Sequence, residues 1–271
     1  MKIGWATPLH HRSAVGRFSV GVAAALAGQG MRVDLLRTER LTVAAEPRLP
    51  SALKIRDVAR MGDFSQLADY DLLVYNFGDD ASLHERAVDG LMRRPGLCIF
   101  HDADFRDLFR EWMAARDCPQ AALSSTDRLP GRAAPWRHLT GSQASQNPSD
   151  NPLTLEWLAG HAMAAVARER DVLHRLQGCC PGPVRHIPVP SRQAGTTTAP
   201  AAASSFDDYA EGLLPLMRAA IEAEPLMRLS AQLGRELASL GASPDGPEVL
   251  RIAQMATDLF SPGGRLVERP T

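Results

Sequence analysis

The pair His101–Asp102 is the combination with the most evident chemical use in this chain of 271 residues. It directly follows the apolar run Gly96–Phe100, which is typical of a buried strand. A histidine in that place, beside a carboxylate, can act as a base, an oriented hydrogen-bond donor or a ligand clamp. The alternative is that Asp102 caps the next helix and His101 packs at the sheet edge. We take both as the candidate catalytic residues.

A basic loop, "TPLHHRSAVGRFS", follows the first apolar segment. Gly16 lies at the expected strand-to-helix turn, where a glycine lets backbone amides approach an anion. Arg12 and Arg17 flank it. The spacing fits a phosphate site, and it also fits a tight turn with solvated arginines. The loop lacks G-x-G-x-x-G spacing, so the dinucleotide fingerprint is absent.

A third polar segment, "NFGDDASLHE", follows another apolar run. Asp79 or Asp80 is expected to cap the helix that begins there. His84 lies one turn into that helix, where it either contacts a ligand or is a surface residue. Because ligands gather beyond the carboxyl ends of parallel strands, the three polar loops are predicted to surround one site.

Short apolar segments alternate with amphipathic ones along the first 190 residues. Strands are expected at 2–8, 31–38, 53–58, 70–78, 96–102 and 183–190, and helices at 16–30, 82–94 and 105–116. Residues 153–178 fit one long helix, and they fit equally a helix, a strand over 162–167 and a second helix. The alternation predicts an α/β fold with a single Rossmann-like, doubly wound parallel sheet.

The second half of the chain carries two segments with little to bury. Residues 119–151 are predicted to form a long loop, and 191–205 a flexible linker. Helical patterns then cover 206–223, 225–240 and 247–260, with Ser205 as the first N-cap. The predicted organisation is a domain over 1–190, the linker, and a small C-terminal helical segment over 206–262. These helices either pack on the domain or serve oligomerisation.

Composition excludes several classes of protein. The net charge of −1 gives no global field for nucleic acid or an anionic membrane. The four cysteines form no C-x-x-C pair, and no Cys/His cluster has zinc spacing, so no metal site is predicted. Neither a signal peptide nor an apolar run near the roughly 20 residues of a spanning helix is visible. The sequence therefore predicts a cytoplasmic protein without a transmembrane segment.

Four short motifs together resemble the N-terminal half of GT-B glycosyltransferases of the family-4 (group 1) type. They are "WATPLHHRSAVGRFS", "DLLVYNFGDDASLH", "RPGLCIFHDADF" and "HIPVP". Their order and spacing agree with that family over about 190 residues. The helix beginning "SFDDYAEGLL" looks like the helix that ends such enzymes.

The resemblance implies half of a GT-B fold, the half that holds the acceptor. It implies that His101 and Asp102 face the acceptor and the transferred sugar. It also implies that Gly16 and its neighbours lie near the donor phosphates or the acceptor. We take Arg12, Gly16, Arg17, Asn76, Gly78 and His84 as the candidate residues for binding substrate or phosphate. The family's donor domain should follow "IPVP", yet the chain moves into "SRQAGTTTAPAAASS". It has no glutamates eight apart to match the family's donor motif.

Three functions follow from this combination. The first is an accessory or acceptor-binding partner of a complete transferase in glycan assembly. The second is an active sugar transferase whose donor site is completed by a partner chain or by the C-terminal helices. The third is a doubly wound domain that binds an unrelated small ligand. No cofactor is predicted, apart from a nucleotide-sugar if a partner completes the donor site. The predicted partners are a transferase or a second copy of the chain, and a glycan or glycosyl acceptor.

Overall fold

A seven-stranded, fully parallel sheet forms the centre of the protein. The computed structural model describes residues 1–39, 49–57, 64–115, 154–190 and 205–239. The strands are β1 (Lys2–Thr7), β2 (Arg32–Arg37), β3 (Lys54–Asp57), β4 (Leu72–Phe77), β5 (Leu97–Phe100), β6 (Ala164–Ala167) and β7 (Val184–His186). Their spatial order is β3-β2-β1-β4-β5-β6-β7, which confirms the predicted doubly wound α/β architecture.

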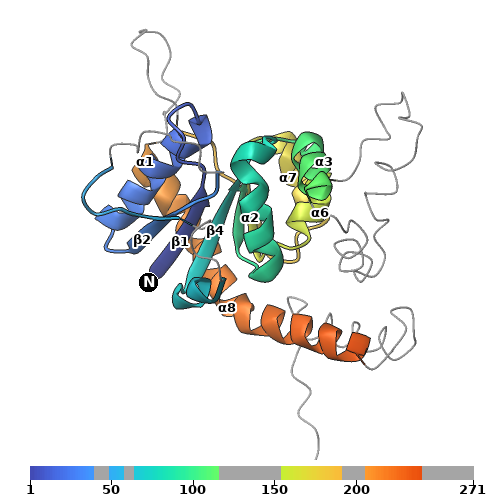
Figure 1. Ribbon diagram of the computed structural model, residues 1–271. Coiled ribbons are helices and arrows are strands. Elements are labelled where there is room, and N and C mark those ends of the chain that lie inside the picture. Colours follow the sequence, from blue (N-terminus) through green and yellow to red (C-terminus); the bar gives the residue numbers. More distant parts are fainter. Residues whose placement is uncertain (40–48, 58–63, 116–153, 191–204, 240–271) are drawn as a thin grey trace, which may run out of the picture. The chain divides into compact units, whose positions relative to one another are not determined.

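Helices cover both faces of this sheet (Figure 1). They are α1 (Ala14–Gly28), α2 (Ala81–Arg93), α3 (Arg106–Ala114), α6 (Thr154–Ala159), α7 (Arg170–Gln177) and α8 (Phe206–Ser239), with a 3₁₀ helix, η1, at Phe64–Asp69. Every residue of β4 and β5 is buried, as expected for parallel strands covered on both sides. Continuous apolar strands thus hold the loops at the carboxyl edge of the sheet.

The structure decides between the two alternatives for residues 153–178. This stretch forms α6, β6 and α7, and no single long helix. The short strand is favoured because Ala164–Ala167 is completely buried between β5 and β7. The predicted loop over 119–151 and the predicted helix over 247–260 lie outside the described residues, as does the predicted linker over 191–205 except for Ser205.

The C-terminal helix differs from the prediction. A break was expected between 223 and 225, but α8 continues from Phe206 to Ser239 through Pro225. Proline removes one hydrogen bond from a helix, and the strong helix formers on either side offset that loss. The chain divides into two compact units, and a boundary between them falls at this proline. The first unit comprises residues 1–119 and 135–224, and the second comprises 120–134 and 225–271.

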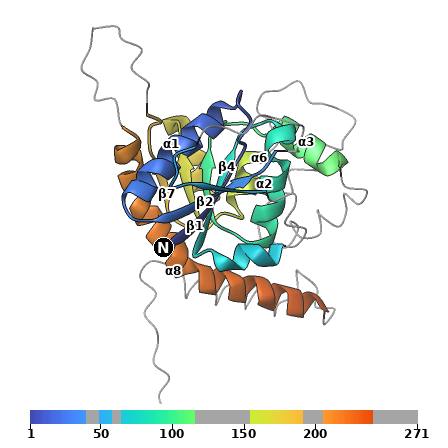
Figure 2. The same ribbon diagram turned by 60° about the vertical axis from the view of Figure 1, so that its left-hand side comes forward.

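The first turns of α8 pack against α1, and Figure 2 shows the two helices side by side. Ser205 and Asp208 cap α8 reciprocally: the Asp208 amide donates to Ser205 Oγ at 3.0 Å, and the Ser205 amide donates to Asp208 Oδ2 at 2.7 Å. The predicted N-cap is therefore confirmed. Tyr209 is buried and meets Phe18 edge-on, with ring centroids 5.0 Å apart.

The Phe206 ring packs against α1 where Gly21 has no side chain. A Cβ atom at position 21 would lie 2.5–2.7 Å from three atoms of the Phe206 ring. Gly21→Ala is therefore expected to displace this ring and to lower the free energy of unfolding by about 1–3 kcal/mol. Urea denaturation of Gly21→Ala, Phe206→Ala and the double variant measures the coupling. The alanine at 21 should cost little once the ring is gone, and equal costs in both backgrounds would contradict this packing.

Among the described residues, no helix combines the length and the apolarity needed to cross a bilayer.

Candidate functional site at the switch point of the sheet

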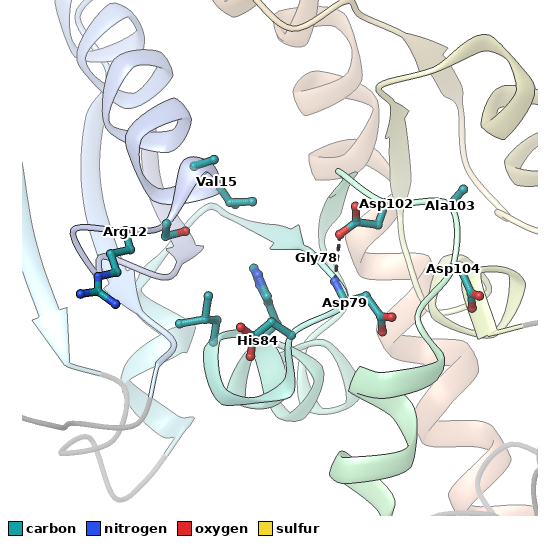
Figure 3. Close-up of a pocket in the computed structure, with 12 residues that line it drawn as sticks. Arg12, Val15, Gly78, Asp79, His84, Asp102, Ala103 and Asp104 are labelled. Carbon is teal, nitrogen blue, oxygen red and sulfur yellow. Dashed lines mark hydrogen bonds between the residues drawn. The ribbon is translucent and has the colours of Figure 1, made fainter.

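A cleft of about 550 Å³ lies beyond the carboxyl ends of β1, β4 and β5. The strand order reverses between β1 and β4, and open α/β sheets bind ligands at such a point. Figure 3 shows the start of α1 on one side and the loops after β4 and β5 on the other. The lining residues are Arg12, Ser13, Ala14, Val15, Gly78, Asp79, Asp80, Leu83, His84, Asp102, Ala103 and Asp104.

The start of α1 forms the basic wall of the cleft. Ser13 is the N-cap of this helix, and its Oγ accepts a hydrogen bond of 3.0 Å from the Gly16 amide. No described residue accepts a hydrogen bond from the amides of Ala14 or Val15, which both line the cleft. These amides and the exposed Arg12 give this wall a positive potential.

Gly16 and Arg17 lie at the start of α1 but are not among the residues that line this cleft. Gly16 lies within the first turn of α1, where a Cβ would approach the Pro8 carbonyl oxygen to 2.3 Å. Its amide is bonded to Ser13, so Gly16 acts here through close packing. Arg17 is exposed, donates to the His11 carbonyl oxygen at 3.1 Å and is absent from the lining.

A buried carboxylate behind the basic wall holds the loop that precedes α1. Glu39 accepts a hydrogen bond of 2.8 Å from the Leu9 amide, and its other oxygen lies 3.6 Å from Arg37 Nε. The adjacent Thr38 donates to the Leu83 carbonyl oxygen at 2.7 Å. These bonds tie the end of β2 to both walls of the cleft.

Carboxylates dominate the opposite wall. Asp102 Oδ2 accepts from the Asp79 amide at 2.9 Å, and Asp79 Oδ1 accepts from the Leu108 amide at 2.9 Å, in the first turn of α3. Burial raises the pKa of Asp79, and the negative charges of Asp107 and Asp104 add to this effect. Asp102 thus links the loop after β5 to the loop after β4. Asp79 accepts a hydrogen bond from a backbone amide in the first turn of α3, which would otherwise have no partner within the helix.

Two predictions about helix caps are now decided. Asp80 is the N-cap of α2, because its Oδ1 accepts from the Ser82 amide at 3.0 Å. Asp102 makes no described bond to α3. There, Asp104 accepts from the Arg106 amide at 3.2 Å, and Asp79 accepts from Leu108. Asp102 is instead exposed in the cleft.

His84 presents an uncharged hydrogen-bond acceptor to the cleft. Its side chain is nearly inaccessible to solvent, and Nδ1 lies 3.0 Å from the Asn76 carbonyl oxygen. A carbonyl can only accept, so Nδ1 carries the proton and Nε2 of the neutral ring holds a lone pair. Burial lowers the pKa of His84 to about 4. No described donor reaches Nε2, and the ring points into the cleft in Figure 3.

Gly78 lets these groups come together. A Cβ at position 78 would lie 3.0 Å from His84 Nε2 and 3.2 Å from Asp102 Oδ2. Any larger residue would therefore crowd both groups. Gly78 is among the predicted site residues, and it lines the cleft as expected for a site in which backbone and functional groups approach closely.

Asn76 and His101 are not among the residues that line the cleft. Asn76 is completely buried, with its Nδ2 donating to the Ala6 carbonyl oxygen at 3.2 Å. Its Oδ1 lies 3.2 Å from His101 Nε2. The His101 ring meets Phe18 edge-on, with centroids 5.0 Å apart. Burial lowers the pKa of His101 to about 3, and the nearby His84 and Arg168 lower it further.

The lowered pKa of His84 predicts a loss of stability in mild acid. The folded ring stays neutral down to about pH 4, whereas a histidine in the unfolded chain takes up a proton near 6.5. Unfolding therefore binds a proton at His84 between these values, and stability falls as the pH drops from about 6.5 towards 4, with about 1.4 kcal/mol per unit from this residue. His101, whose pKa is also lowered by burial, adds a second contribution of the same sign. Urea unfolding between pH 7 and 5 measures this slope.

Two matched variants test whether His84 causes this dependence of stability on pH. His84→Asn should remove the share of the slope that comes from His84 and leave the share that comes from His101, whose pKa is also lowered. His174→Asn, on the exposed side of α7, should leave the slope as in the unchanged protein. The same slope in all three proteins would contradict a buried neutral ring at position 84.

The structure thus brings four of the predicted residues into one cleft: Arg12, Gly78, His84 and Asp102. Sequence reasoning missed Ser13, although a serine before an amphipathic segment is an N-cap signal. It also missed the role of Asp79, for which no local signal exists. The described residues contain no cluster of three or more potential metal ligands.

The cleft combines a positive wall, an acidic wall and a neutral imidazole acceptor, an arrangement suited to a ligand rich in hydroxyl groups. The chain matches no protein-family profile, and no curated protein is significantly similar to it in sequence.

Proposed function

We propose that this chain is a glycosyltransferase-like protein of glycan assembly that binds the hydroxyl groups of a sugar acceptor in the cleft. In this role it is an accessory, acceptor-binding partner of a complete transferase. The proposal rests on the motif resemblance described above and on the chemistry of the cleft.

The orientation of His84 carries the proposal. A buried imidazole whose Nδ1 is bonded to a carbonyl oxygen offers Nε2 only as an acceptor, and the low pKa keeps it so at neutral pH. Such a group cannot attract phosphate as a cation would. It can accept a hydrogen bond from a sugar hydroxyl, and Asp102 beside it offers a second acceptor.

The charge of the lining supports an acceptor rather than a nucleotide donor. The described lining residues include four aspartates, namely Asp79, Asp80, Asp102 and Asp104, and one cation, Arg12. Transfer from a nucleotide-sugar requires groups that stabilise the charge developing on the leaving diphosphate. A wall of carboxylates repels a diphosphate, whereas carboxylates are good acceptors for hydroxyl groups.

Saturation-transfer NMR and calorimetry of the full chain test this proposal. The ligands are a panel of neutral oligosaccharides, sugar phosphates and nucleotide-sugars. We expect a saccharide to bind in the cleft, and we expect an attached nucleotide to add little to its affinity. Tight binding of a nucleotide-sugar by the isolated chain, or binding of no saccharide in the panel, would contradict it.

A further inference from the structure

One buried residue of β4, Asn76, is bonded to both histidines of the site. Its main-chain oxygen lies 3.0 Å from His84 Nδ1, and its side-chain Oδ1 lies 3.2 Å from His101 Nε2. Its Nδ2 donates to the Ala6 carbonyl oxygen of β1 at 3.2 Å. Asn76 therefore connects β1, the end of β5 and the first turns of α2 at the point where the strand order reverses.

The bond to Ala6 determines the orientation of the amide. Because the Ala6 carbonyl oxygen can only accept, the NH₂ group of Asn76 must face β1 and Oδ1 must face His101. Oδ1 is also only an acceptor, so His101 must carry its proton on Nε2. The same reasoning places the proton of His84 on Nδ1. The two imidazoles are thus held as opposite tautomers by one residue.

We propose that Asn76 is the positioning residue of the site, which sets the tautomer and orientation of His101 with its side chain and of His84 with its main chain. It touches no ligand, since it is completely buried and lies outside the lining of the cleft. What the two histidines then do for a ligand rests on the proposed function, but their tautomers do not.

Asparagine is the side chain that this position requires. An aspartate of the same shape would place an oxygen against the Ala6 carbonyl oxygen and a negative charge beside His101. That charge would favour the imidazolium form, although the positive fields of Arg168 and a protonated His84 oppose it. A leucine would leave the Ala6 oxygen and His101 Nε2 without partners.

Long-range ¹H–¹⁵N NMR spectra of the full chain test the assignment without any ligand. These spectra distinguish protonated from bare ring nitrogens. In the unchanged protein, His84 should be protonated on Nδ1 alone and His101 on Nε2 alone between pH 6 and 8. A proton on Nδ1 of His101, or on Nε2 of His84, would overturn the proposal before any variant is made.

Asn76→Ala separates the two halves of the proposal within one protein. It removes Oδ1 but keeps the main-chain carbonyl, so His101 should populate both tautomers while His84 stays protonated on Nδ1. Val74→Ala is the control, because Val74 is an equally buried residue two positions earlier on the same face of β4. It should change neither histidine. An unaltered His101 in Asn76→Ala would overturn the proposal.

Asn76→Asp supplies a second readout if the alanine variant is unstable. The carboxylate should raise the pKa of His101 by about 1–3 units, which the same spectra follow across a pH titration. An unchanged pKa would count against a direct bond between these side chains. Saccharide affinity is measured separately. If the unchanged protein binds no saccharide, the proposed function fails while the tautomer measurements still decide the role of Asn76.

Discussion

Replacing Gly16 by alanine is expected to lower the free energy of unfolding by about 3 kcal/mol, the upper part of the usual range for an overpacked site. The new Cβ would meet the Pro8 carbonyl oxygen at 2.3 Å and the Pro8 carbonyl carbon at 3.3 Å. Both are backbone atoms, so no side-chain rotation can relieve the contact. Either the first turn of α1 or the loop after β1 must move, and both form the basic wall of the cleft.

Urea denaturation monitored by circular dichroism measures this loss, and Gly28→Ala is the matched control. Gly28 is the last residue of the same helix, and a Cβ there would meet no atom within 4 Å. Its replacement should leave stability unchanged or raise it by up to about 1 kcal/mol, because alanine is the better helix former. Equal effects of the two substitutions would contradict the close approach of α1 to Pro8.

The second large effect is expected on saccharide binding when His84 is replaced by asparagine or by glutamine. Each amide side chain can take the place of one of the two ring nitrogens. His84→Asn can keep the donor to the Asn76 carbonyl oxygen but places no atom near the position of Nε2. His84→Gln reaches that position, and its side-chain oxygen can accept a hydrogen bond. We therefore expect His84→Asn to weaken saccharide binding about tenfold or more, and His84→Gln to retain most of it.

Calorimetric titration of both variants with the best saccharide of the panel measures this difference. Circular dichroism and thermal unfolding must show that both variants fold, since each changes a buried residue. If His84→Asn binds as well as the unchanged protein, then Nε2 makes no contact with the ligand. If both variants lose binding equally, the role of His84 is packing rather than hydrogen bonding.

The architecture of this protein follows from local patterns. The apolar runs around Leu72–Phe77 and Leu97–Phe100 are too continuous for exposed elements, and each is followed by an amphipathic helix. These patterns predict a parallel sheet, and such a sheet must collect the polar ends of its strands at one edge. The place of the cleft, and the presence there of Arg12, Gly78, His84 and Asp102, could therefore be predicted.

The inner arrangement of the site could not be predicted, because it depends on contacts between distant segments. Asp79 belongs to the loop before α2, yet it accepts a hydrogen bond from the start of α3. Asn76 looks like a ligand-binding residue at the end of a strand, and the sheet buries it between Ala6 and His101. Gly16 resembles a phosphate-loop glycine, but its packing against Pro8 is a tertiary contact. The spacing of residues along the chain does not indicate which distant residues come into contact.

The proposed function depends most directly on a ligand hydroxyl reaching His84 Nε2, and the ¹⁵N signal of this atom can be followed during titration with a saccharide. We predict that the Nε2 signal shifts towards that of a hydrogen-bonded nitrogen in a saturable manner, while Nδ1 stays protonated and the His174 signals stay in place. Saccharide binding that leaves the Nε2 signal of His84 unchanged would show that the ligand occupies another site, and would contradict the proposal.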